Sequence, residues 1–182
     1  MEHYSTTQKY TNSCFPCSLQ ICLENLGKHY PDHFIEDCWN EEMKNLVPGG
    51  LNSQACNTEF IHEMLGKMNL DLKRGLIITP EDLRNFSDIA EATHLIIDNK
   101  LNNFLANNND IGIVAGIEHA NAICRVNNEW FICNPSNGTI CCSDSCDFDI
   151  LKDNDQYAIR IQGGYGGNEF SHVGTYFMLM TP

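Results

Sequence analysis

Hydrophobic residues recur at helical spacing through the first third of the chain. A first pattern begins after Asn12-Ser13, either of which can cap a helix, and ends at Gly27; its apolar face consists of Leu19, Cys22, Leu23 and Leu26. A second pattern runs from Pro31 to Leu46, and a third covers about 53–68. The sequence therefore predicts three helices before any strand.

The rest of the chain alternates between short apolar runs and polar turns. This pattern is typical of strands, and it predicts them over 70–78, 94–97, 111–117, 156–161 and 173–180, with a helix start at Thr79-Pro80. No internal repeat and no linker-like break is evident. We therefore expect one domain over residues 1–182, of the α+β class, with N-terminal helices packed on a mostly antiparallel β-sheet.

A hairpin is predicted around Asn127-Asn128, because asparagine tolerates the positive φ angles that a two-residue turn requires. In that register Val126 pairs with Glu129, and Asn121 lies opposite Asn134. His119 would share a face with Asn121, so His119 and Asn134 would be diagonal neighbours across the two strands. A slip of one residue would place them on opposite faces.

Composition and charge exclude two classes of partner. The chain has 182 residues, an apolar fraction of 42% and a formal net charge of −13. Nucleic acid and anionic membranes both attract basic surfaces, so we expect neither as a partner. No apolar run is long enough to span a membrane. An acidic surface suits a basic protein partner, although solubility explains it as well.

The ten cysteines are too sparse for a small disulfide scaffold, and the N-terminus lacks the pattern of a signal peptide. We therefore expect mostly free thiols in a cytoplasm, either that of the source cell or that of a host into which the protein is secreted as an effector. We expect no cofactor and no metal. The sequence says nothing about the oligomeric state.

Two segments together suggest an active site. Gln8 precedes Cys14 by six residues, Cys14 opens the first helix, and His119 and Asn134 flank the predicted hairpin. A thiolate can attack a carbonyl, an imidazole can transfer the proton, and an amide can orient the imidazole. The side-chain amide of Gln8 and the backbone N–H of Cys14 would hold the oxyanion. The helix start and a nearby imidazolium would both lower the pKa of the Cys14 thiol.

In these residues the chain resembles papain-like (clan CA) cysteine peptidases. It is nearest to the C39-like peptidase domains, which have a glutamine, a cysteine that opens a helix and a histidine-led hairpin. Trp130-Phe131 before Asn134 is similar to Josephin-type deubiquitinases. The chain has Phe15 where glycine often follows the cysteine, and Asn134 where C39-like domains have aspartate. The resemblance covers about 45 residues in two blocks.

The resemblance implies a thiol hydrolase that cleaves a peptide or isopeptide bond in a protein or peptide substrate, with ubiquitin-like proteins among the candidates. The same machinery supports glutamine deamidation or acyl transfer, because these reactions differ only in the second step. A catalytically degenerate papain-like domain that binds a protein partner is a further alternative.

Other interpretations of single residues stay open. Cys14 and Cys17 have the spacing of a thioredoxin-type redox pair. His172 is a rival for the catalytic histidine, and His94 is expected to be structural. A zinc site could combine Cys14 and Cys17 with Cys141, Cys142 and Cys146.

Overall fold

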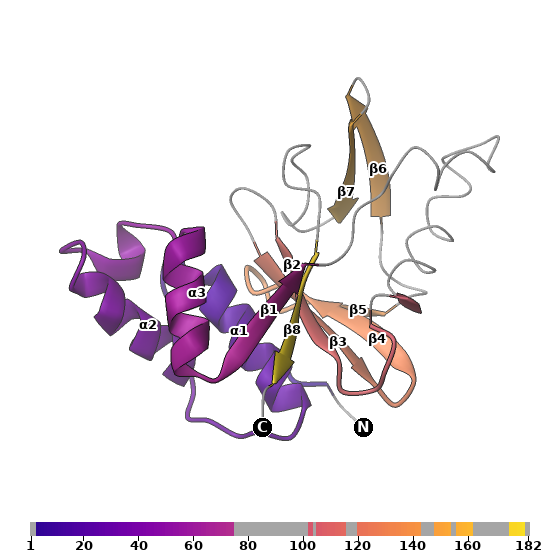
Figure 1. Ribbon diagram of the computed structural model, residues 1–182, viewed down its shortest axis with the longest axis horizontal. Coiled ribbons are helices and arrows are strands. Elements are labelled where there is room, and N and C mark those ends of the chain that lie inside the picture. The colour runs from indigo at the N-terminus through magenta and orange to yellow at the C-terminus, as the bar shows by residue number, and fades with distance from the viewer. Residues whose placement is uncertain are drawn as a thin grey trace.

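In the computed structural model of the chain, three helices precede the main sheet (Figure 1). The structure describes residues 3–74, 102, 103, 105–115, 120–142, 148–153, 156–161 and 175–180. The helical elements are α1 (Cys14–Asn25), α2 (Phe34–Lys44), the short 3₁₀ helix η1 (Gly50–Asn52) and α3 (Thr58–Lys67). The prediction of three N-terminal helices is confirmed.

Two helices begin later than their sequence patterns indicate. Helix α2 starts at Phe34, because His33 adopts the left-handed conformation, with φ 58°, and Pro31 and Asp32 precede it as a turn. Helix α3 starts at Thr58, because Asn57 caps it: the Asn57 side chain accepts a 2.8 Å hydrogen bond from the backbone N–H of Phe60.

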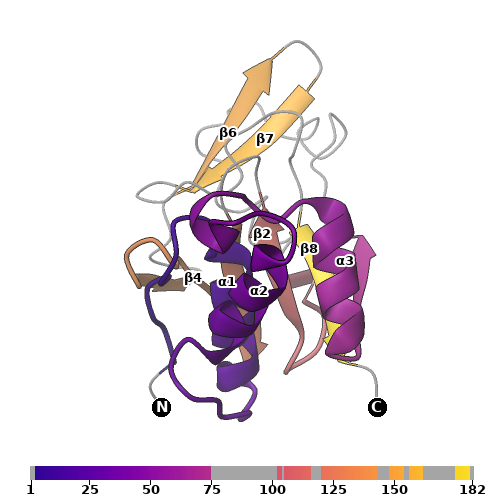
Figure 2. The same cartoon turned by 90° about the vertical axis from the view of Figure 1, so that its left-hand side faces the viewer.

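Within the described residues, the main sheet has six strands in the order β1-β8-β2-β3-β4-β5, and all of their pairings are antiparallel. Strands β6 and β7 form a separate two-stranded sheet. The helices gather on one face of the main sheet (Figure 2). The α+β class is therefore observed, with a predominantly antiparallel sheet. The strands are β1 (Leu70–Arg74), β2 (Ile111–Ala115), β3 (Ala120–Val126), β4 (Glu129–Cys133), β5 (Ile140–Cys142), β6 (Phe148–Asp153), β7 (Gln156–Ile161) and β8 (Thr175–Met180).

The predicted hairpin forms in the expected register. Asn127 and Asn128 have φ angles of 54° and 68°, as a two-residue turn of this type requires. Val126 pairs with Glu129, and the register runs to Ala122 opposite Cys133. Both strands have neighbours on either side, so the hairpin lies inside the sheet, as predicted.

Helix α1 packs directly on strand β3. Ala120 and Ala122 contribute only methyl groups to the core there, so the helix backbone can approach closely. Ser18 donates a 3.2 Å hydrogen bond to the carbonyl of Ala120, and the Cys22 thiol lies 3.6 Å from the carbonyl of Gly112. The N-terminal end of α1 is thereby fixed at the start of β3.

The core contains thiols whose ionisation opposes folding. Burial raises the pKa of Cys133 to about 12 and also raises the pKa of Cys17. In the unfolded chain a thiol titrates near 8.5. Above that pH the unfolded state loses protons that the folded state retains, so the free energy of unfolding falls as pH rises.

We predict that urea unfolding will show stability declining from about pH 8.5 towards pH 12, by up to about 1.4 kcal/mol per pH unit for each such thiol. Cys133→Ala should make this decline shallower. If the stability of both proteins stayed flat over this range, the buried-thiol assignment would be wrong.

Several predictions concern residues that the structure does not describe. They are the helix start at Thr79-Pro80, the strand at 94–97, and the role of His172 as a rival catalytic histidine. The same holds for the glycine-rich segment Gly163–Gly167. Within the described ranges, no helix has the length and apolar character needed to cross a membrane.

Candidate active site

Cys14 is the first residue of α1 and lies against the start of β3. It is partly buried, and the backbone N–H of Ala120 lies next to its sulfur, together with the N–H groups of Phe15 and Cys14 itself. Ala120 follows His119 in the sequence. The fold therefore brings the predicted nucleophile to the residue next to the predicted histidine, although the two are far apart in the chain.

The described surroundings raise the pKa of the Cys14 thiol. Burial is the main cause, and the negative charge of Glu36 adds to it; the three backbone N–H groups act in the opposite direction. The helix start therefore helps the thiolate, as its position predicts, but burial outweighs it. A thiolate at neutral pH needs a cation beside Cys14 in addition to these groups.

His119 lies outside the described residues. The strand that follows it does show how the two faces of β3 are used. Ala120, Ala122 and Cys124 belong to the core beneath α1, which puts Asn121 on the other face. Because β3 begins at Ala120, strand alternation does not fix the residue before it.

Asn134 follows the last residue of β4 and is nearly buried, with 7% of its surface exposed. The observed register ends at Ala122 opposite Cys133, one residue short of the predicted pairing of Asn134 with Asn121, which stays a prediction. The side-chain oxygen of Asn134 accepts a 3.0 Å hydrogen bond from the backbone N–H of Ser136, which stabilises the turn that follows.

The Gln8 backbone is joined to the same turn. Its N–H donates a 2.7 Å hydrogen bond to the carbonyl of Pro135, the residue after Asn134. The Gln8 side chain is directed elsewhere, because its Nε2 donates to the carbonyls of Tyr10 at 3.1 Å and Thr11 at 3.0 Å. To act as an oxyanion donor, the Gln8 amide must rotate away from these two carbonyls, as catalytic groups can when substrate binds.

Glu36 is a buried carboxylate in the first turn of α2, close enough to Cys14 for its charge to raise the pKa of that thiol. The sequence pattern did not identify it as part of the site. It is 1% exposed, and its Oε2 accepts from the Ser13 hydroxyl and the Lys9 backbone N–H, both at 2.6 Å. Its Oε1 lies 2.8 Å from Nδ1 of His33. Glu36 thus ties the segment that carries Gln8 and Cys14 to α2. A glutamate inside an apolar helical pattern was the only signal for it.

Asn121 is a second polar group that the sequence did not assign to the site. It is fully buried, and neither its side-chain oxygen nor its nitrogen has a hydrogen-bond partner among the described residues. Buried amides are normally paired, so an unpaired one calls for an explanation. Asn121 lies on the face of β3 away from α1, and therefore on the other side of the sheet from Cys14.

The cysteine alternatives find little support in the described part of the chain. Cys14 and Cys17 are both free thiols, and Cys17 is fully buried beside Glu36. Cys141 is disulfide-bonded, an exception to the free thiols that were expected. Cys146 lies outside the described residues. Within those residues, no cluster of three or more histidine, cysteine or acidic side chains could hold a metal ion.

Comparison with known proteins adds no relative: no family model matches the chain, and no curated protein matches it.

Proposed function

We propose that this protein is a papain-like cysteine hydrolase. In this proposal Cys14 is the nucleophile, His119 the general acid and base, and Asn134 the group that orients His119. Gln8 and the backbone N–H of Cys14 form the oxyanion hole. The contact of Cys14 at the start of α1 with Ala120, the residue after His119, is the observation that carries the proposal.

The chemistry follows from these roles. His119 takes the proton from the Cys14 thiol, and the sulfur adds to the substrate carbonyl to form a tetrahedral oxyanion. Collapse breaks the C–N bond; the imidazolium protonates the departing amine, and a thioester on Cys14 is left. Water, deprotonated by His119, then adds to the thioester, and the carboxylic acid and the free thiol are released.

The proposed substrate is a protein or peptide, with a Gly-Gly or ubiquitin-type isopeptide bond as one candidate. If the departing group is ammonia from a glutamine side chain, the same steps give deamidation. If an amine replaces water in the second step, they give acyl transfer. The thioester is common to all three reactions, so it is the species to detect.

A partner-binding domain without catalysis is the second candidate. Two observations favour it: the Nε2 of Gln8 is used within its own loop, and burial raises the pKa of Cys14. Such a domain would bind its partner without forming a thioester.

We predict that acid-quenched mixtures of the protein with amide substrates will contain an acyl adduct on Cys14, detected by intact mass and peptide mapping. The substrates tested are peptides, ubiquitin conjugates and glutamine-rich proteins. The adduct should be released by hydroxylamine, as a thioester is, and should be absent in Cys14→Ala. Cys38→Ala, which removes an exposed free thiol, is the matched control. An adduct that survives in Cys14→Ala would contradict the proposal.

A further inference from the structure

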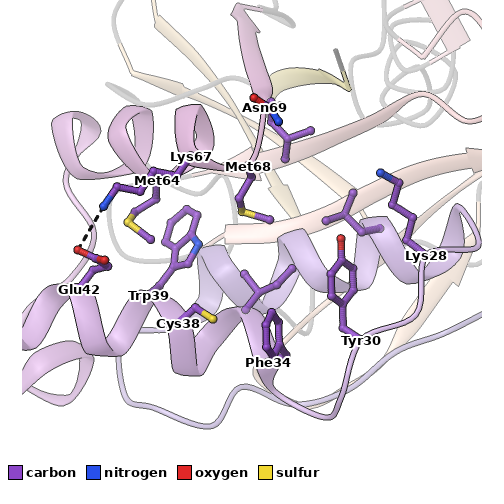
Figure 3. A pocket seen from close by; sticks show the side chains of 13 residues that line it. Lys28, Tyr30, Phe34, Cys38, Trp39, Glu42, Met64, Lys67, Met68 and Asn69 are labelled. Atoms are coloured by element: carbon purple, nitrogen blue, oxygen red, sulfur yellow. Dashed lines mark ion pairs between the residues drawn. The ribbon is translucent and has the colours of Figure 1, made fainter. Parts of the chain in front are cut away.

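A cavity of about 390 Å³ lies between α1, α2, α3 and the start of β1 (Figure 3). Its volume is typical of a site for a small organic molecule. None of the predicted catalytic residues lines it. Its floor is buried and apolar, and consists of Leu23, Ile35, Trp39, Met64 and Leu70.

The rim combines flexible and aromatic side chains. Tyr30 and Phe34 stack with ring centroids 5.9 Å apart, and Phe34 is 43% exposed. Met68 can adapt its shape to a bound group, because its side chain is unbranched and polarizable. These rim residues can therefore pack against the apolar part of a bound molecule.

Trp39 brings an unpaired hydrogen-bond donor into this apolar floor. It is 1% exposed, and its indole N–H has no partner among the described residues. Figure 3 shows the indole nitrogen turned towards the interior of the cavity, between Met68 and Cys38. The indole N–H is itself buried, so it does not reach a ligand directly, but its resonance reports on what occupies the floor of the cavity.

The charged rim residues also favour a ligand with acceptor atoms. At one end of the cavity, Lys67 is neutralised by Glu42 at 3.3 Å. At the other end stands Lys28, which makes no ion pair within the described ranges. Lysine and the indole N–H can only donate hydrogen bonds. Among the charged lining residues, Lys28 therefore favours an anionic group at its end of the cavity.

We propose that this cavity binds a small amphipathic carboxylate, with its hydrocarbon or aromatic body on the apolar floor beside Trp39 and its carboxylate at Lys28. The proposal does not depend on the reaction at Cys14, so Cys14→Ala should bind the ligand as the unchanged protein does. Failure of the hydrolase proposal would leave this one standing, and the converse also holds.

Decanoate, used below its micelle-forming concentration, is the probe. The chain has two tryptophans, so its ¹H–¹⁵N spectrum should contain two indole N–H peaks, and Trp39→Phe assigns the peak of Trp39. Decanoate should shift the Trp39 peak saturably and leave that of Trp130 in place. Decanol should bind more weakly, and decyltrimethylammonium weaker still, because Lys28 would repel it.

Variants separate the contributions. Trp39→Phe should weaken decanoate binding about two- to fivefold by calorimetry, because the smaller ring removes apolar contact with the decanoate chain. Lys28→Gln should weaken it about two- to fivefold and leave decanol unaffected. Cys38→Trp places a large ring on the exposed rim and should block binding without disturbing the core. Glu41→Trp, exposed on the same helix but away from the cavity, is its matched control.

The absence of any saturable shift with decanoate would overturn the proposal. It would also be overturned if decanol or the cationic amphiphile bound as tightly as decanoate, or if Cys38→Trp bound decanoate normally.

Discussion

Replacement of His119 by alanine is expected to slow thioester formation on Cys14 by about 10²- to 10⁴-fold, the usual contribution of a general acid–base catalyst. The effect should be large because burial and Glu36 raise the pKa of the Cys14 thiol, and only backbone N–H groups among the described residues oppose them. Without the imidazole the thiol would stay protonated at neutral pH. Rates of adduct formation under acid quench measure this effect.

The matched control is His62→Ala, because His62 is exposed on α3 and far from α1 in the sequence. It should react at the unchanged rate. Asn134→Asp should retain most activity, since a carboxylate can accept both the Ser136 N–H and an imidazole N–H. Equal rates in His119→Ala and the unchanged protein would remove His119 from the mechanism.

Replacement of Glu36 by alanine is expected to lower the free energy of unfolding by about 3 kcal/mol, since it removes the acceptor of two short hydrogen bonds and leaves a cavity where the buried side chain was. The donors are the Lys9 N–H and the Ser13 hydroxyl, both 2.6 Å from the Glu36 carboxylate. For a domain of this size that loss corresponds to a fall in melting temperature of about 6–12 °C. Calorimetry measures both quantities.

Two further variants serve as controls for Glu36→Ala. Glu36→Gln keeps the shape and one acceptor oxygen, so its loss should be smaller. Glu41→Ala removes an exposed carboxylate from the same helix, paired with Lys44 at the surface, and should change stability by less than about 1 kcal/mol. If Glu36→Ala were as mild as Glu41→Ala, Glu36 would not anchor the Lys9–Ser13 segment.

The parts of the fold that could be predicted depend on local chemistry. The apolar face of α1 follows from spacing alone. The hairpin register follows from Asn127-Asn128, because few residues other than glycine tolerate positive φ as asparagine does. The turn and the count of residues on either side of it are enough to set Ala122 opposite Cys133, as observed.

The parts that could not be predicted depend on contacts between distant segments. Ser13 was expected as a possible cap, but its hydroxyl instead donates to the Glu36 carboxylate, with the Tyr10 carbonyl as an alternative acceptor. Glu36 becomes important only because α2 folds back against residues 9–13. Strand β5 is too short to be recognised in the sequence next to the turn before it. Strand β6 mixes polar and apolar residues, so its sequence does not show the pattern of a strand. The side chain of Gln8 was assigned by spacing, which cannot reveal that nearby carbonyls hold it.

The hydrolase proposal depends above all on the activation of Cys14 by His119, which can be measured as the rate of Cys14 alkylation by iodoacetamide against pH. Site-resolved mass spectrometry separates Cys14 from Cys38, an exposed thiol that serves as the internal reference. An ion pair that lowered the pKa to about 6 would raise the thiolate fraction there more than a hundredfold, while reduced nucleophilicity would cancel part of this gain.

We therefore predict that Cys14 reacts at least about tenfold faster near pH 6 than it does in His119→Ala, and faster than Cys38 in the same sample. The described groups around Cys14 raise its pKa, so an inflection near pH 6 requires an added cation. The contradicting result is a Cys14 that reacts only as pH approaches about 9 or above, with the same profile in His119→Ala.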